Sequence, residues 1–173
     1  MPIDSPILPV ATLGILGGGQ LGRMFTLAAR TMGYRVMVLD PDPSSPAGQM
    51  ADVHLQADYT DHGALKKMAE ACQAVTTEFE NVPAASLIEL ARYTRVAPSA
   101  EAVAIAQERG REKAWLRENG FATAPFALIA NEDELVAGAN LTGFPAILKV
   151  SRFGYDGKGQ ARVGNLDELT AAF

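Results

Sequence analysis

Residues 15–24 read ILGGGQLGRM, and this stretch decides the fold. It follows a short apolar run, residues 12–16, and contains the spacing Gly17-x-Gly19-x-x-Gly22. A strand, a glycine-rich turn and a helix N-terminus in this order are typical of dinucleotide-binding folds, where glycines let the backbone approach a phosphate. The spacing leaves three roles open for the loop: it holds a nicotinamide cofactor, it holds another ligand with a phosphate, or it only lets a strand and a helix pack closely.

The first hundred residues alternate between strand and helix patterns. Apolar residues recur at helical spacing after the glycine loop, and Gly33 can end that helix. Further strand-length apolar runs lie at residues 34–40, 52–57, 74–80 and 94–98. Asp61 and Pro83 suit the starts of two further helices between these runs. Strands that alternate with helices predict an α/β fold with a doubly wound parallel sheet of the Rossmann type.

The pattern changes after about residue 99. The expected elements are then a charged helix over 108–119, a connector with a short strand over 121–129, a helix over 131–141, a strand over 144–151, a glycine-rich loop over 152–160, a return strand over 161–164 and a helix over 166–173. We therefore divide the chain into residues 1–110 and 111–173. The second part is expected to begin a domain that it does not complete.

Composition excludes several classes of protein. Hydrophobic residues make up 48% of the 173 residues and charged residues 20%, which predicts a packed core. A net charge of −5 argues against nucleic acid as a partner, and no apolar run is long enough to cross a membrane. The N-terminus lacks a secretory pattern, and Cys72 is the only cysteine. These features predict a cytoplasmic protein.

A second glycine-rich loop lies between two expected strands. It contains Gly154, Gly157 and Gly159, with Lys158 inside it and Lys149 at the end of the strand before it. Backbone N–H groups of such a loop, beside lysine charges, are suited to a polyphosphate. The loop is not a P-loop, because its Gly-Lys pair is not followed by Ser or Thr and does not open a helix.

Five segments, in order along the chain, resemble the N-terminal part of the 5-(carboxyamino)imidazole ribonucleotide synthases, ATP-dependent purine-biosynthesis enzymes of the ATP-grasp superfamily. The segments are residues 17–24 (GGGQLGRM), 38–52 (VLDPDPSSPAGQMAD), 76–82 (TTEFENV), 107–113 (QERGREK) and 147–160 (ILKVSRFGYDGKGQ). The resemblance covers about Leu13 to Gly164, and enzymes of the family are more than twice as long as this chain. It implies a pre-ATP-grasp, substrate-binding domain over 1–110, followed by the beginning of an ATP-grasp domain.

The resemblance implies that the first glycine loop faces a ribonucleotide substrate. The positions that match the family's substrate contacts are Gly19, Gln20, Leu21 and Glu78. Their expected places agree, because Gln20 and Leu21 open a helix and Glu78 ends a parallel strand, at the edge where ligands gather. From the residues alone, Gln20 serves equally well as a helix cap and Glu78 as a solvated carboxylate.

The resemblance also implies an ATP site. Arg109 and Lys149 match the family's early ATP contacts, and the second loop would cover the phosphates. The loop positions are Gly154, Tyr155, Asp156, Gly157, Lys158, Gly159 and Gln160. The Mg²⁺ that accompanies ATP has no ligands among these residues, and its ligands are expected downstream of Phe173.

The implied reaction joins ATP, bicarbonate and 5-aminoimidazole ribonucleotide to give a carbamate, ADP and phosphate. Tyr155 and Asp156 are the expected catalytic residues: Asp156 as the base that takes a proton from the amine, and Tyr155 as the group that positions it or the bicarbonate. From the residues alone, Asp156-Gly157 is first of all a common turn pair. The resemblance further implies a homodimer, and we expect the 173-residue chain alone to lack complete ligase activity.

Three other functions remain open from the sequence. A nicotinamide-dependent oxidoreductase would use the first glycine loop together with Asp40, at the end of the second strand, to bind a ribose hydroxyl. Another ATP-grasp ligase, such as the formate-dependent glycinamide ribonucleotide transformylase, shares much of the pattern, although its first loop more typically carries an acidic residue at Gln20. The third possibility is a nucleotide-binding or structural module without catalysis.

Overall fold

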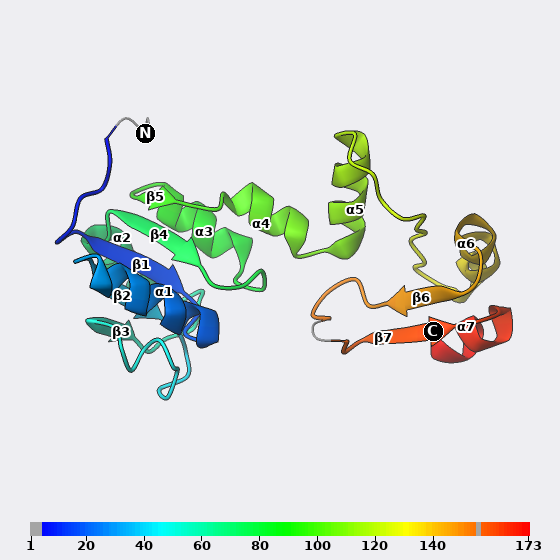
Figure 1. Cartoon of the computed structure of the whole chain (residues 1–173), viewed down its shortest axis with the longest axis horizontal. Coiled ribbons are helices and arrows are strands. Elements are labelled where there is room, and N and C mark those ends of the chain that lie inside the picture. The colour runs from blue at the N-terminus through cyan, green and yellow to red at the C-terminus, as the bar shows by residue number, and fades with distance from the viewer. Residues whose placement is uncertain (1–4, 155–156) are drawn as a thin grey trace. The chain divides into compact units, whose positions relative to one another are not determined.

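The computed structural model describes residues 5–154 and 157–173 (Figure 1). The chain forms two compact units, which we name the N-terminal unit (Met1–Ala104) and the C-terminal unit (Ile105–Phe173). The predicted catalytic pair, Tyr155 and Asp156, lies outside the described residues. Our division into functional domains at residues 110 and 111 stays a prediction.

The N-terminal unit alternates strands and helices, as the apolar spacing predicted. Its elements are β1 (Thr12–Leu16), α1 (Gln20–Thr31), β2 (Arg35–Leu39), β3 (Val53–Leu55), α2 (His62–Ala71), β4 (Ala74–Thr77), α3 (Ala84–Ala91) and β5 (Arg95–Val96), with α4 (Ala100–Ala106) after them. Local signals set several ends: the Asp61 carboxylate accepts the Ala64 N–H at the start of α2, and Gly33, with a φ of 88°, follows α1.

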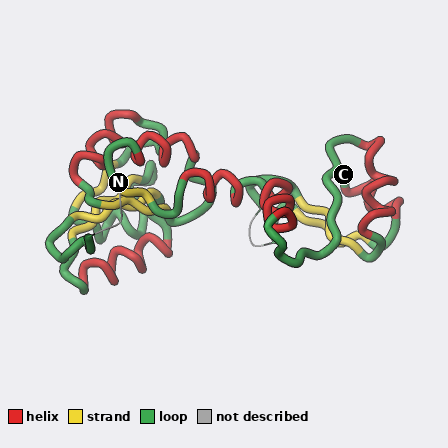
Figure 2. The backbone as a smooth tube through the Cα atoms, turned by 90° about the horizontal axis from the view of Figure 1, so that it is seen from above, coloured by secondary structure: helices red, strands yellow, loops and turns green. Residues whose placement is uncertain are grey.

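The five strands form one sheet in the order β3-β2-β1-β4-β5, and every pair is parallel. This confirms the doubly wound fold. The sheet lies between helices, with α1 on one face and α2 and α3 on the other, and Figure 2 shows helices on both sides of it. The strand order reverses between β1 and β4, so the carboxyl ends of these two strands form the switch point at which ligands bind in such folds.

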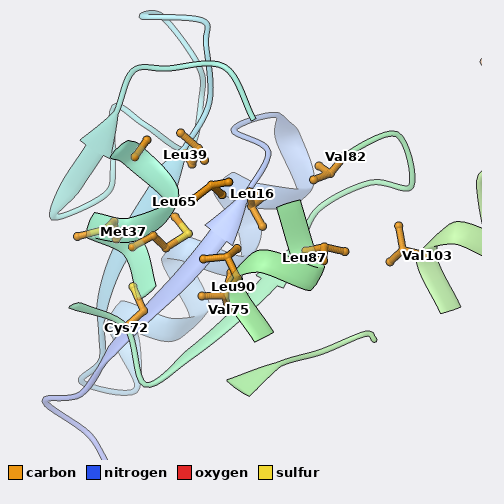
Figure 3. Packing of buried hydrophobic residues seen from close by; sticks show 12 residues of the cluster. Leu16, Met37, Leu39, Leu65, Cys72, Val75, Val82, Leu87, Leu90 and Val103 are labelled. Carbon is orange, nitrogen blue, oxygen red and sulfur yellow. The ribbon is translucent and has the colours of Figure 1, made fainter. Parts of the chain in front are cut away.

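Alternate residues of the central strands fill two separate cores. Leu16, Met37 and Leu39 face α2 and α3, whereas Ile15, Val36 and Val38 face α1. Figure 3 shows the first of these cores, in which side chains from β1, α2 and α3 meet. All six residues are buried, which explains why successive residues near the carboxyl ends of β1 and β2 are apolar, as expected for a parallel sheet covered on both faces.

The C-terminal unit is built on an antiparallel hairpin. Its elements are α5 (Arg109–Glu118), the 3₁₀ turn η1 (Glu132–Glu134), α6 (Leu135–Thr142), β6 (Ala146–Lys149), β7 (Gln160–Val163) and α7 (Leu166–Ala172). One face of the β6–β7 hairpin packs on α6 and α7 through a small core of Leu135, Ala139, Val163 and Leu169. The opposite face carries Lys149 beside its register partner Gln160.

The short strand expected within residues 121–129 was a wrong prediction. This segment is extended but pairs with no other strand of the described chain. Instead it runs along α6, where the side chain of Ile129 lies against Gly138, which leaves room because it has no Cβ. Pro125 also removes one of the backbone donors that a paired strand would use.

Candidate functional site

The first glycine loop connects β1 to α1 at the switch point of the sheet. Gly17 has a φ of 101°, a left-handed conformation that strongly favours glycine, and its N–H donates to the Leu39 carbonyl at 3.0 Å. A Cβ on Gly22 would lie 2.7 Å from the Gly17 carbonyl oxygen. Two of the three fingerprint glycines are therefore required by the backbone itself, whatever the loop binds.

The carboxylate of Glu78 lies on this loop. One of its oxygens accepts the Gly19 N–H at 2.6 Å, and the other accepts the Leu21 N–H at 3.2 Å. Glu78 follows β4 directly, and because Leu16 pairs with Thr77 the two chain segments end side by side. Gln20, Leu21 and Glu78 were expected to meet here beside the glycine loop, and Leu21 and Gly19 do contact Glu78. Their role as substrate contacts stays a prediction. The negative charge there also complements the N-terminus of α1.

A second carboxylate, Asp40, faces the same loop from the end of β2. One of its oxygens accepts the Gly18 N–H at 2.7 Å and the Tyr59 hydroxyl at 2.8 Å, and the other accepts the Asp42 N–H at 2.8 Å. Burial of the Tyr59 phenol and its hydrogen bond to Asp40 raise its pKa well above the ordinary value. The Asp40 side chain thus fixes the loop and is not presented to a ribose.

These contacts weigh against a dinucleotide. In a nicotinamide enzyme the loop amides face the pyrophosphate, and the acidic residue after the second strand binds a ribose hydroxyl. Here the N–H groups of Gly18, Gly19 and Leu21 donate to Asp40 and Glu78 of the chain itself. A pyrophosphate at this position would have to displace two carboxylates of its own charge.

A cavity of about 390 Å³ is lined by residues of β1, α1 and β4 together with Glu78. Its lining is mainly apolar and includes Ile15 and Phe25, and Thr76 and Thr77 of β4 add hydroxyl groups. Leu21 and Glu78 both line it, whereas Gly19 and Gln20 do not. Gln20 is exposed at the first position of α1.

The second predicted site forms a polar cavity of about 210 Å³ in the C-terminal unit. Every described residue of the expected ATP site lines it, and Val150 is the one further residue that does. The expected residues are Arg109, Lys149, Gly154, Gly157, Lys158, Gly159 and Gln160. Sequence positions about forty residues apart are therefore brought to one concave surface.

Two lysines and an arginine give this cavity its charge. Within the described part of the chain, neither Arg109 nor Lys149 takes part in an ion pair, and both are exposed. Exposed cations around a concave loop are suited to an anionic ligand with several oxygens. The Val150 N–H donates to the Gly159 carbonyl at 2.9 Å, which joins the end of the glycine loop to the residue that follows β6.

Close packing explains one of the loop glycines. Gly159 has a φ of 67°, and a Cβ at this position would lie 2.5 Å from a methyl carbon of Val150. A side chain there would push the loop away from the strand. Gly157 also has a positive φ, 80°, so the turn of the loop depends on both residues.

Sequence reasoning missed three residues that organise the two sites, and it considered a fourth, Asp40, only as a ribose contact. Asp40 and Tyr59 hold the first loop, as described above. Glu108 and Ser151 join two elements at the second: the Ser151 hydroxyl donates to the Glu108 carboxylate, and the Arg109 N–H donates to the Ser151 carbonyl at 3.0 Å. Glu and Ser side chains 43 positions apart carry no local signal of such a contact.

A metal site cannot be built from the described residues. No group of three or more His, Cys, Asp or Glu side chains comes together among residues 5–154 and 157–173. The two histidines have other partners: His54 contacts the Asp40 carbonyl oxygen and His62 contacts Glu89. None of the helices described is both long and apolar enough to cross a bilayer.

Two family models match the chain in the order of its two units. The model described as the ribonucleotide synthetase preATP-grasp domain matches residues 10–107, and the ATP-grasp domain model matches residues 114–173. Both glycine loops lie inside these matches. Arg109 lies in the short interval between them.

Two similar proteins from different bacteria are both N5-carboxyaminoimidazole ribonucleotide synthases. The chain is 45% identical over 163 residues to the N5-carboxyaminoimidazole ribonucleotide synthase of Brucella melitensis, covering 94% of this chain and 45% of that protein. It is 42% identical over 154 residues to the enzyme of the same name from Bacillus subtilis, covering 89% and 40%. The chain therefore spans less than half the length of these relatives.

Solved structures agree with these relatives. An N5-carboxyaminoimidazole synthetase of Staphylococcus aureus complexed with ADP superposes with a TM-score of 0.91 at 36% identity, over 96% of this chain and 45% of that one. The Aspergillus clavatus synthase, in complex with ADP and 5-aminoimidazole ribonucleotide, superposes with a TM-score of 0.78 at 31% identity, over 94% and 43%. The fold of both units thus occurs in enzymes crystallised with a nucleotide.

Proposed function

The chain belongs to the ribonucleotide synthetase pre-ATP-grasp family and continues into an ATP-grasp domain, and from this premise we propose that the full-length protein carboxylates 5-aminoimidazole ribonucleotide. The reaction consumes ATP and bicarbonate and gives 5-(carboxyamino)imidazole ribonucleotide, ADP and phosphate. It would serve de novo purine biosynthesis in the cytoplasm. The similar synthases named above support this assignment.

One observation carries the proposal for this chain. The expected ATP residues that the structure describes, Arg109, Lys149 and the glycine loop, line a single polar cavity. Its cations would neutralise the phosphates of ATP, and the loop N–H groups would hold them in place for transfer to bicarbonate. The product of that step, carboxyphosphate, delivers its carboxyl group to the substrate amine.

The N-terminal unit would supply the ribonucleotide site. Glu78 is held by the Gly19 and Leu21 N–H groups, so its carboxylate has a fixed position in the lining of the larger cavity. A fixed carboxylate can accept hydrogen bonds from the amine or ribose hydroxyls of the substrate. Gln20, exposed at the same helix start, is proposed as a further contact.

The remaining assignments follow from the family. Asp156 is proposed as the base that takes the proton lost when the amine becomes a carbamate, with Tyr155 positioning it or the bicarbonate. Mg²⁺ is proposed to accompany ATP, where it would offset charge on the transferred phosphate. The described residues offer no cluster of ligands for it, and its ligands are proposed to lie beyond Phe173. A homodimer is the proposed assembly.

The test measures phosphate release by the full-length protein. ATP and bicarbonate are supplied with 5-aminoimidazole ribonucleotide, and parallel reactions contain formate and glycinamide ribonucleotide instead. Lys149→Gln should weaken ADP binding about 10- to 100-fold, because one charged hydrogen bond to phosphate is lost. Lys66→Gln is the matched control, since Lys66 lies on exposed α2 surface beside Glu70.

Three results would contradict the proposal. Turnover with formate and glycinamide ribonucleotide alone would assign the related transformylase. Saturable binding of NADH that ADP does not reverse would assign the oxidoreductase. Equal ADP affinity in the wild type and Lys149→Gln would remove the second cavity as the nucleotide site.

A further inference from the structure

Arg109 and Lys149 reach the polar cavity from different elements. Arg109 is the first residue of α5, and Lys149 is the last residue of β6. About forty residues of chain, including an extended connector and α6, separate them. Something other than chain continuity must therefore hold the start of α5 next to the end of β6.

Two hydrogen bonds make this connection. The Ser151 hydroxyl, two residues after Lys149, donates to the carboxylate of Glu108, and the Arg109 N–H donates to the Ser151 carbonyl at 3.0 Å. The Glu108 carboxylate also accepts the Gly110 N–H at 3.0 Å and the Arg111 N–H at 3.2 Å. One side chain thus caps α5 and joins it to the strand that carries Lys149.

We propose that Glu108, through Ser151, is the positioning residue that sets the distance between Arg109 and Lys149 in the nucleotide cavity. This inference rests on the proposed function, namely that the cavity binds the phosphates of ATP. Glu108 itself does not line the cavity. Its carboxylate acts on the cavity through its hydrogen bonds to Ser151 and to the start of α5.

Losing this connection would change the fraction of molecules in which Arg109 and Lys149 have the spacing that binds the ligand. When the connection is lost, α5 and the strand sample other separations, and only a fraction of molecules presents both cations at the spacing a polyphosphate needs. The apparent dissociation constant rises by the inverse of that fraction. The Ser151–Glu108 hydrogen bond is exposed to solvent, and the bond from the Arg109 N–H to the Ser151 carbonyl remains when it is lost. We therefore expect the low end of the range, a factor of about 3 to 10.

A simpler role for Glu108 is only to cap α5, and two substitutions separate the two roles. Ser151→Ala removes the hydroxyl donor but leaves Glu108 free to cap α5. Glu108→Asp keeps the charge and a good N-cap, yet it is one methylene too short to cap the helix and reach Ser151 together. Ser151→Thr restores the hydroxyl. Glu118→Gln, at the other end of α5, is the matched control for charge.

The experiment measures ADP affinity by calorimetry on the full-length protein, together with KM for ATP and for 5-aminoimidazole ribonucleotide. Unfolding of the C-terminal unit is followed on the 173-residue chain by the fluorescence of Trp115, the only tryptophan among these 173 residues. We expect Ser151→Ala and Glu108→Asp to raise the ADP Kd and the KM for ATP about three- to tenfold. The KM for the ribonucleotide should stay unchanged, the Trp115 midpoint should fall only slightly, and Ser151→Thr and Glu118→Gln should match the wild type in ADP affinity.

Equal ADP affinity in all variants would overturn the inference. A loss of affinity that the unfolded fraction of the C-terminal unit at the assay temperature fully accounts for would also overturn it, because Glu108 would then act only through folding. Absence of ADP binding in the wild type would overturn the proposed function first. That result appears before any variant is compared, so the two failures are distinguishable.

Discussion

Replacing Glu78 by alanine should loosen the junction of β1, α1 and β4. In the native chain this carboxylate accepts the Gly19 N–H at 2.6 Å and the Leu21 N–H at 3.2 Å. Alanine leaves both donors without their acceptor. The Gly19 N–H is partly buried, so water replaces the lost bond only in part.

The size of the effect follows from these contacts. A hydrogen bond to a charged group contributes about 1.5–3 kcal/mol, and we count one such bond because the Leu21 contact is longer and exposed. A carboxylate at a helix N-terminus adds about 0.3–1 kcal/mol. Together they predict that Glu78→Ala lowers the free energy of unfolding of the N-terminal unit by about 2–4 kcal/mol. Glu78→Gln keeps one acceptor oxygen and should cost about half as much.

The assay uses the single cysteine and the single tryptophan of the 173-residue chain. Cys72 is buried in the N-terminal unit, and Trp115 lies in the C-terminal unit, so thiol labelling and fluorescence report the two units separately during urea unfolding. Glu78→Ala should lower the urea midpoint of Cys72 labelling and leave the Trp115 transition in place. Glu70→Ala, which removes only an exposed pair with Lys66, is the control.

A change smaller than about 0.5 kcal/mol in the thiol transition would refute this reasoning, because that is the size expected of a surface substitution without a structural role. Equal shifts in the Cys72 and Trp115 transitions would also contradict the prediction, which places the effect in the N-terminal unit alone. They would mean that the N–H groups of α1 contribute to a cooperative unit larger than the one described.

Three further predictions concern other parts of the chain. Gly18→Ala would place a Cβ 2.5 Å from the Ser45 hydroxyl oxygen, so we expect urea unfolding to show a loss of about 1–3 kcal/mol, and an unchanged midpoint would contradict the packing. Burial raises the pKa of the Cys72 thiol to about 12, so a thiol reagent at pH 8 should label it only as fast as the N-terminal unit opens; rapid labelling of the folded chain would count against this. The Ser151 hydrogen bond lowers the pKa of Glu108, so the stability it adds is complete above the pKa of the unfolded chain and is lost as pH falls through the lower, folded pKa. Carbon NMR should find the Glu108 midpoint below that measured in urea, and a higher midpoint would contradict it.

The fold was predictable because its signals are local. Apolar runs of strand length, helical spacing between them and breakers such as Gly33 give the order of elements, and a parallel sheet follows from that order. The prediction of a strand within residues 121–129 was wrong, because the spacing of apolar residues does not show what such a segment packs against. An extended apolar segment reads the same whether it pairs with a strand or, like Ile129, packs along a helix.

The sequence predicted where the site residues lie, but it did not predict which hydrogen bonds they make with one another. Residues after parallel strands gather at one edge, so Glu78 and the first glycine loop were expected to meet. Which groups the loop amides face is decided by side-chain reach in three dimensions. Asp40, expected to bind ribose if the loop held a dinucleotide, instead binds Gly18 and Tyr59. The contact between Glu108 and Ser151 similarly depends on a hairpin and a helix being placed side by side.

The central position of β1 in its sheet has a consequence for how the chain acquires its structure. Leu16 pairs with Thr77, 61 residues later, so the middle of the sheet forms only after a long loop has closed. The hairpin of the C-terminal unit joins Lys149 to Gln160 across about ten residues, a closure that costs less entropy and takes less time. In stopped-flow refolding, Trp115 fluorescence should therefore recover before Cys72 becomes protected, although the N-terminal unit precedes the other in the chain.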